Sequence, residues 1–216
     1  MLFRSLMTQF YATHAGQGGM MNDLLTMLTG QKTEKLQAAP SFLREMVVFP
    51  YQEGQKFALA LQIEGGVEAI NRAFEKPPTS TEQILHPEKF TGTRDEPKAV
   101  TLPVLSSAEW RLIGSNVLGE FGIRALLTTQ LGFAEAQSAA AGWGGDRYQV
   151  YERGAGGPLG LVWESVWDDE HEAEEFADAY RRFAEKRGVP ARVTQSGAKV
   201  RVIQSDATGF LDLVKE

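Results

Sequence analysis

The chain has 216 residues, 43% of them hydrophobic and 23% charged, which is the composition of an ordinary globular protein. Its net charge is −6, with Lys and Arg scattered along it, so we expect no nucleic-acid partner, because phosphate neutralisation supplies most non-specific affinity. No run approaches the roughly 20 apolar residues of a membrane-spanning helix, and the absence of cysteine excludes disulfides, thiolate catalysis and cysteine-based metal sites.

The first residues are not typical of a signal peptide, since residues 1–5 contain one Arg and a very short apolar run. Residues 6–28 have apolar side chains at helical spacing, interrupted by the glycines of residues 16–19. Residues 6–11 resemble the middle of a helix that lacks an N-cap. We therefore expect the natural sequence to continue upstream of residue 1; the alternative is a frayed terminal helix.

A second helical region is predicted to open at residue 40 and to break at Phe49-Pro50-Tyr51. The helix that follows is expected to end at Gly65-Gly66. A short helix over residues 67–75 then stops at Pro77-Pro78.

Thr79 or Ser80 is the predicted N-cap, with Glu82 or Gln83 three residues later at capping-box spacing. The single turn that it opens should run to His86 and stop at Pro87. Residues 91–98 are polar and are predicted to form a loop.

Alternating apolar residues predict an edge strand over residues 100–104, and strand character continues over residues 110–118. Two helices are predicted next, over residues 120–131 and 133–141.

After Gly142 the periodicity changes from helical to alternating. Strands are predicted over residues 147–151 and 161–167, followed by an acidic helix over residues 168–188. A hairpin over residues 192–203 and a short helix near Leu211 complete the chain.

The predicted fold class is α+β: a mainly helical N-terminal part, followed by a small antiparallel sheet with a packed helix. The predicted domains are residues 6–142 and residues 143–216, the second packed on the first.

The most distinctive local motif spans residues 80–89 and contains Glu82 and His86, four residues apart. One helical turn places these two side chains on the same face, where a carboxylate can orient an imidazole and raise its pKa. The alternative is a structural turn in which His86 bonds a buried carbonyl group.

The second motif spans residues 142–148 and contains three glycines followed by Asp146, Arg147 and Tyr148. The glycines predict a tight backbone path, and Asp146 can form a bidentate ion pair with Arg147. The alternative is a purely structural junction between a helix and a strand.

Other candidate sites are weaker. An acidic run surrounds His171, which is typical of a solvated helix face. The sequence has three histidines and no His-Glu-x-x-His zinc motif.

Together these motifs, in the order in which they occur, resemble an uncharacterised bacterial family of zincin-like metallopeptidases of the gluzincin type. The motifs that carry the resemblance are Phe49-Pro50-Tyr51, Gly65-Gly66, Pro77-Pro78, residues 80–87, Gly119-Glu120 and residues 142–148. The resemblance covers residues 6–167 and implies a metal-binding helix upstream of residue 1.

The resemblance implies that this chain supplies the non-metal wall of a substrate cleft. Its candidate catalytic residues are His86, Glu82, Arg147 and Tyr148, and it offers no metal ligands. No cofactor is expected in this chain, and zinc is expected only where the upstream segment is present. The implied partners are a peptide or protein and the N-terminal segment of the same protein.

Two hypotheses follow from the sequence. The first is a truncated or degenerate zinc-metallopeptidase-like protein that is inactive as this chain alone. The second is a non-catalytic binding module that uses its Trp-rich sheet, with Trp163 and Trp167, or its acidic helix to meet a partner. The sequence does not identify the substrate or the compartment.

Overall fold

A computed structural model describes residues 38–207 and 209–214. The chain divides into two compact units, residues 1–44 and residues 45–216, and the described elements lie almost entirely in the second. The helix predicted over residues 6–28 lies outside the described residues. Among the described helices, none is both long enough and apolar enough to cross a membrane.

The first described element is helix α4 (Ser41–Glu75). It continues through Pro50, so the predicted break at Phe49-Pro50-Tyr51 is wrong. Proline removes one backbone hydrogen bond from a helix, but flanking turns can carry the helix past it. The real interruption is a kink at Gly65 and Gly66, whose backbone angles are not helical, as the sequence predicted.

Two short helices pack against α4 and shape the region of His86. They are α5 (Thr81–Leu85) and α6 (Glu88–Thr91). Apolar side chains on both sides of the α4 kink form one small core with them: Phe57, Leu61, Ala69, Ile70, Ala73, Ile84 and Phe90.

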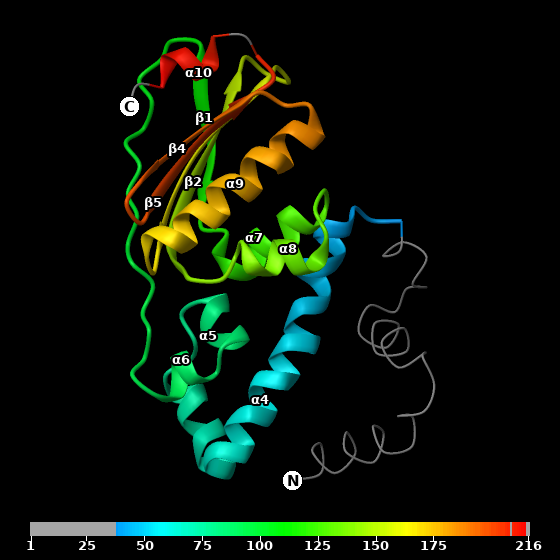
Figure 1. The fold of residues 1–216 in the computed structure, drawn as a ribbon, viewed down its shortest axis with the longest axis vertical. Coiled ribbons are helices and arrows are strands. Elements are labelled where there is room, and N and C mark those ends of the chain that lie inside the picture. Colours follow the sequence, from blue (N-terminus) through cyan, green and yellow to red (C-terminus); the bar gives the residue numbers. More distant parts are fainter. Residues whose placement is uncertain (1–37, 208, 215–216) are drawn as a thin grey trace. The chain divides into compact units, whose positions relative to one another are not determined.

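The α+β prediction is confirmed by a five-stranded antiparallel sheet in the order β1-β2-β3-β5-β4 (Figure 1). The strands are β1 (Trp110–Asn116), β2 (Trp143–Arg153), β3 (Leu159–Trp167), β4 (Ala191–Ser196) and β5 (Lys199–Ser205). Strand β1 belongs to this sheet although it precedes the predicted domain boundary at residues 142/143. Helices α7 (Gly119–Thr128) and α8 (Phe133–Ser138) lie between β1 and β2 in the chain and so connect two strands of the same sheet.

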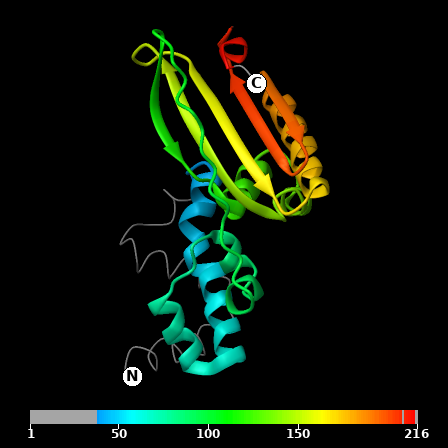
Figure 2. The ribbon, with the colours of Figure 1, turned by 90° about the vertical axis from the view of Figure 1, so that its left-hand side faces the viewer.

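Helix α9 (Glu170–Arg187) packs on one face of the sheet, as Figures 1 and 2 show. Asp169 caps its N-terminus, and Gly188, in the left-handed conformation, ends it. The core beneath it contains Trp163 and Trp167, both almost fully buried. The proposed Trp-rich binding surface is therefore wrong, because alternation along β3 turns both indoles inward toward α9.

The other face of the sheet is partly covered by the segment of residues 97–109, which has no strand pairing. The edge strand predicted over residues 100–104 is therefore wrong. Leu102 and Leu105 instead pack against a second core that contains Trp110, Tyr151 and Phe210, the last from α10 (Phe210–Leu213). Apolar alternation here reflects a chain lying over a sheet face, which needs alternate burial but no ladder of hydrogen bonds.

Candidate functional site

His86 sits at the end of the capped turn predicted from the sequence. The side chain of Ser80 accepts a hydrogen bond from the backbone N–H of Gln83. The backbone N–H of His86 donates to the backbone carbonyl of Glu82 at 2.8 Å. The capped turn is confirmed, and Pro87 immediately begins the next turn. These bonds fix the backbone from which the His86 ring projects.

The partner of the His86 ring is Glu120, in the first turn of α7. The His86 Nε2 atom lies 2.9 Å from Glu120 Oε1. The side chain of His86 is 37% exposed, whereas that of Glu120 is 5% exposed. The hydrogen bond to Glu120 raises the pKa of His86 above its usual value, and partial burial opposes this only in part.

Glu120 has further capacity to hold a positive charge. Its second oxygen, Oε2, is buried and accepts no hydrogen bond within the described part of the chain. A buried carboxylate with a vacant acceptor is costly unless a cation lies beside it. His86 is the partner that the geometry provides, so the pair favours an imidazolium held against a buried carboxylate.

Glu82 does not orient His86, and this part of the predicted site is corrected. The Glu82 carboxylate accepts a hydrogen bond from Lys89 Nζ at 2.6 Å. The turn between residues 82 and 86 places Glu82 inward, nearly fully buried, while the His86 ring turns toward α7. Burial raises the pKa of the Glu82 carboxyl to about 7 although Lys89 opposes this effect.

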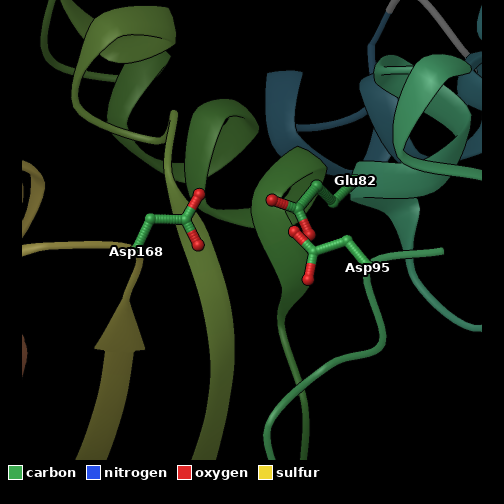
Figure 3. Close-up of side chains that lie close together, drawn as sticks. All are labelled: Glu82, Asp95 and Asp168. Carbon is green, nitrogen blue, oxygen red and sulfur yellow. The ribbon is translucent and has the colours of Figure 1, made fainter. Parts of the chain in front are cut away.

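Lys89 lies among three carboxylates, and we call these four residues the Lys89 cluster. Its ammonium is 2.6 Å from Glu82, 3.0 Å from Asp168 and 3.2 Å from Asp95. Figure 3 shows the three carboxylates converging from separate parts of the chain. Burial lowers the pKa of Lys89, but its hydrogen bonds to Glu82 and Asp168 outweigh burial, so that pKa is raised.

The Lys89 cluster does not fit a zinc ion. Its ligand-type atoms are all carboxylate oxygens, whereas protein zinc sites rely largely on histidine or cysteine. The Lys89 ammonium also contacts all three carboxylates and so takes the place that a metal ion would need. Within the described part of the chain, the cluster is therefore a network of ion pairs in which Glu82 is buried and the other members are partly exposed.

Asp146 forms no ion pair with Arg147, and that prediction is also corrected. Its Oδ1 accepts from the Gly119 N–H and the Trp143 indole, both at 2.9 Å. Its Oδ2 accepts from the Leu118 N–H at 2.9 Å and the Trp163 indole at 3.0 Å. Burial raises the pKa of Asp146, and these four N–H donors oppose that rise by stabilising the carboxylate.

Arg147 and Tyr148 lie on opposite faces of β2, because they are consecutive residues of one strand. Tyr148 packs against the core beneath α9. Arg147 instead lines a cavity of about 350 Å³ together with Lys98. That cavity is not lined by His86 or Tyr148, so the structure does not gather His86, Arg147 and Tyr148 into one cleft.

The cavity, which we call the Lys98–Arg147 pocket, lies where the two distinctive motifs meet. Ser80 and Thr81 come from the first motif, and Trp143, Asp146 and Arg147 come from the second. Gly119 completes the junction, with Thr81 Oγ1 so close that a Cβ on Gly119 would lie 2.7 Å from it. Motifs about 60 residues apart thus form one neighbourhood, and Glu120, the partner of His86, is the next residue after Gly119.

Sequence reasoning missed Lys89 and the role of Glu120. Lys89 is the last residue of the first motif, and Glu120 belongs to the quoted pair Gly119-Glu120. Both residues were therefore visible in the pattern. Their partners come from elsewhere in the chain and follow only from the tertiary packing.

Residues 110–214 match the family described as Domain of unknown function (DUF8575). The match begins at β1 and ends beyond α10, so it covers the sheet together with α7, α8 and α9. Neither the curated proteins nor the solved structures give a significant match.

Proposed function

We propose that this protein has a metallopeptidase-like function and that the region of α5 and α7 forms the non-metal wall of its peptide cleft. The sequence motifs support the family resemblance. The observation that carries the proposal is the contact between His86 and Glu120. It holds a partly exposed imidazole against a buried carboxylate, with Nε2 and Oε1 2.9 Å apart.

The free edge of the His86 ring is the reactive part of this proposal. Nε2 faces Glu120, while Nδ1 lies 3.7 Å from the exposed carboxylate of Glu88, beyond hydrogen-bond range. A protonated ring can therefore donate from Nδ1 to a peptide carbonyl oxygen. Such a donor stabilises the negative charge that develops on that oxygen during hydrolysis. Glu120 is the positioning residue that keeps the ring charged and oriented.

The proposal assigns no zinc ligand to this chain. Among the described residues, the carboxylates that lie close enough together to hold a metal ion are the three that surround Lys89. The Nε2 atom of His86 is already hydrogen-bonded to Glu120. We propose that the chain by itself binds peptide without hydrolysing it.

The alternative proposal is a non-catalytic interaction module. Its support is the exposed acidic side of α9, on which Glu174 and Asp178 face solvent. A partner bound there would be basic and would not need His86.

Peptide binding by the full chain tests the proposal. Isotope-labelled protein would be titrated with the neutral peptide acetyl-Ala-Ala-Ala-amide while the His86 ring resonances are followed. We expect His86→Ala to weaken binding about tenfold, the equivalent of one charged hydrogen bond. His171→Ala is the matched control, because His171 is exposed on α9 and contacts only Glu175 among the described residues.

Glu120→Gln separates positioning from simple contact. The variant retains the size of the side chain but removes the charge that raises the pKa of His86. We expect the ring to titrate at lower pH and peptide binding near neutral pH to weaken. Unchanged peptide affinity in His86→Ala, with circular dichroism confirming a folded protein, would contradict the cleft wall and favour the interaction module.

A further inference from the structure

We propose that the Lys98–Arg147 pocket binds the carboxylate of a peptide ligand. This inference rests on the proposed peptide-binding function and names a chemical group of the peptide that would be recognised at a cavity separate from His86. The pocket has a volume of about 350 Å³, within the range of small-ligand sites. Four separate segments line it, through residues 79–81, 97–100, 117–119 and 143–147.

Arg147 has no carboxylate partner within the part of the chain that the structure describes. Its cross-strand neighbour is Glu164 on β3. Glu164 forms an ion pair with Arg201 instead, whose Nε and Nη2 atoms lie 3.2 and 3.0 Å from Glu164 Oε2. The Arg147 guanidinium, with its planar fork of N–H donors, is therefore left facing the cavity side of the sheet without an internal anion.

Lys98, an exposed residue, supplies a second cation in the lining of the same cavity. Its Nζ donates to the backbone carbonyl of Trp167 at 3.2 Å, which anchors the side chain, and no acidic side chain of the described residues pairs with its charge. Its backbone N–H donates to the Gly144 carbonyl at 2.7 Å and so fixes the segment to the start of β2. The position of this ammonium is thus set by backbone contacts.

The acid that lines the pocket cannot easily neutralise these two cations. Both oxygens of Asp146 are occupied, each by two N–H donors. Two cations against one fully engaged carboxylate leave the lining with an excess positive charge. Because the whole chain carries −6, this is a local reversal of sign.

The shape and charge favour a carboxylate as the ligand. A guanidinium binds a carboxylate through two parallel hydrogen bonds, and a nearby ammonium adds a further charge. In a peptide, that group can be the terminal carboxylate or the side chain of Asp or Glu. Ser80, also in the lining, has a hydroxyl whose oxygen accepts from Gln83, so its proton is available to the same anion.

Three peptide probes distinguish the sources of the carboxylate. Acetyl-Ala-Ala-Ala with a free carboxylate is compared with its C-terminal amide and with acetyl-Ala-Asp-Ala-amide, each titrated into the full chain at low salt. We expect one of the two charged probes to bind about tenfold more tightly than the neutral amide. The tighter of them identifies the source, and the preference should weaken as salt is raised.

The variants test the pocket itself. Arg147→Gln and Lys98→Gln should each remove the preference for the charged probe over the neutral amide. Lys199→Gln, an exposed lysine on β5, is the matched control and should retain the preference. Circular dichroism and urea unfolding would establish that each variant is folded.

The outcomes separate this inference from the proposed function. Equal affinity for all three probes, or a preference that survives Arg147→Gln in a folded protein, would overturn the carboxylate pocket. His86-dependent binding of the neutral amide would still stand in that case. A preference that Arg147→Gln removes, together with indifference to His86→Ala, would support the pocket and reject the His86 wall.

Discussion

The carboxylate of Asp146 joins three parts of the chain at a single point. It accepts hydrogen bonds from the first turn of α7, through Leu118 and Gly119, and from the indoles of Trp143 and Trp163. Helix α7 has no side-chain cap of its own, so Asp146 acts as its N-terminal anion from a distant strand. The residue is therefore structural, and it fixes the helix that presents Glu120 to His86.

We predict that Asp146→Asn destabilises the protein by about 3 kcal/mol. The amide has one acceptor oxygen, and its NH₂ group would face two of the four N–H donors, which leaves buried donors unpaired. The measurement is the free energy of unfolding in urea, followed by tryptophan fluorescence. Asp206→Asn is the matched control, because Asp206 is exposed and its carboxylate forms no ion pair or hydrogen bond with the described residues, so it should change stability by less than about 0.5 kcal/mol. A difference of less than about 1 kcal/mol between the two variants would contradict this role.

Chemical identity at the residue scale was predictable, but pairing was not. The sequence indicated that His86 needs a carboxylate partner, and Glu82 was the nearest in sequence. In this one-turn helix the Glu82 side chain points inward and accepts a hydrogen bond from Lys89. The carboxylate that contacts the His86 ring is that of Glu120 on α7. Sequence proximity favours i,i+4 pairs only on an exposed helix face, and this turn is packed on two sides.

At the scale of elements, the segment of residues 97–100 is held against the start of β2 by close backbone contact. Gly145 lies so near this segment that a Cβ built on it would lie 2.2 Å from the Lys98 carbonyl oxygen. Gly145 also has φ +159°. Close backbone packing thus explains the glycine at position 145 of the second motif.

We predict that Gly145→Ala destabilises the protein by about 2 to 4 kcal/mol, since backbone rather than a flexible side chain must move. The matched control is Gly114→Ala in β1, where a Cβ meets nothing within 4 Å. The control should stay within about 0.5 kcal/mol of the parent. Thermal unfolding of the three proteins measures the difference, and equal midpoints would show that the contact is not needed.

Most elements of the sheet unit were predictable because periodicity and capping agree there. The acidic helix α9 has a strong apolar stripe, an Asp cap and a terminal Gly, and the hairpin of β4 and β5 turns at Gly197. The errors lie where one signal stood alone. Pro50 predicts a break but no other stop signal accompanies it, and the alternation at Leu102 predicts a strand for which the fold offers no pairing partner.

At the scale of the whole molecule, several buried or partly buried groups titrate in the same direction. Burial raises the pKa of Glu82 to about 7, burial raises that of Asp146, and the Glu120 hydrogen bond raises that of His86. An acid whose pKa is raised in the folded state binds a proton more tightly there, so stability falls as pH rises from the unfolded pKa to the folded pKa. A histidine whose pKa is raised in the folded state contributes stability below its unfolded pKa, and this stability is lost as pH rises through its folded pKa. These effects add.

We therefore predict that the free energy of unfolding is higher at pH 5 than at pH 8. Glu82 accounts for the fall between its ordinary pKa of 4.5 and its folded-state pKa of about 7, and His86 accounts for a further fall above its ordinary pKa of 6.5. The contribution of Glu82 should be roughly 2 to 3 kcal/mol between pH 5 and pH 8, because one pKa unit corresponds to about 1.4 kcal/mol and a pKa of about 7 already includes the opposing effect of Lys89. Urea unfolding at fixed ionic strength across this pH range measures the slope.

Glu82→Gln should flatten the part of this slope between pH 5 and 7, whereas Glu174→Gln, at an exposed residue of α9, should leave it unchanged. Stability that rises with pH over this range, or an equal slope in Glu82→Gln, would show that Glu82 is ionised throughout and held by Lys89 alone.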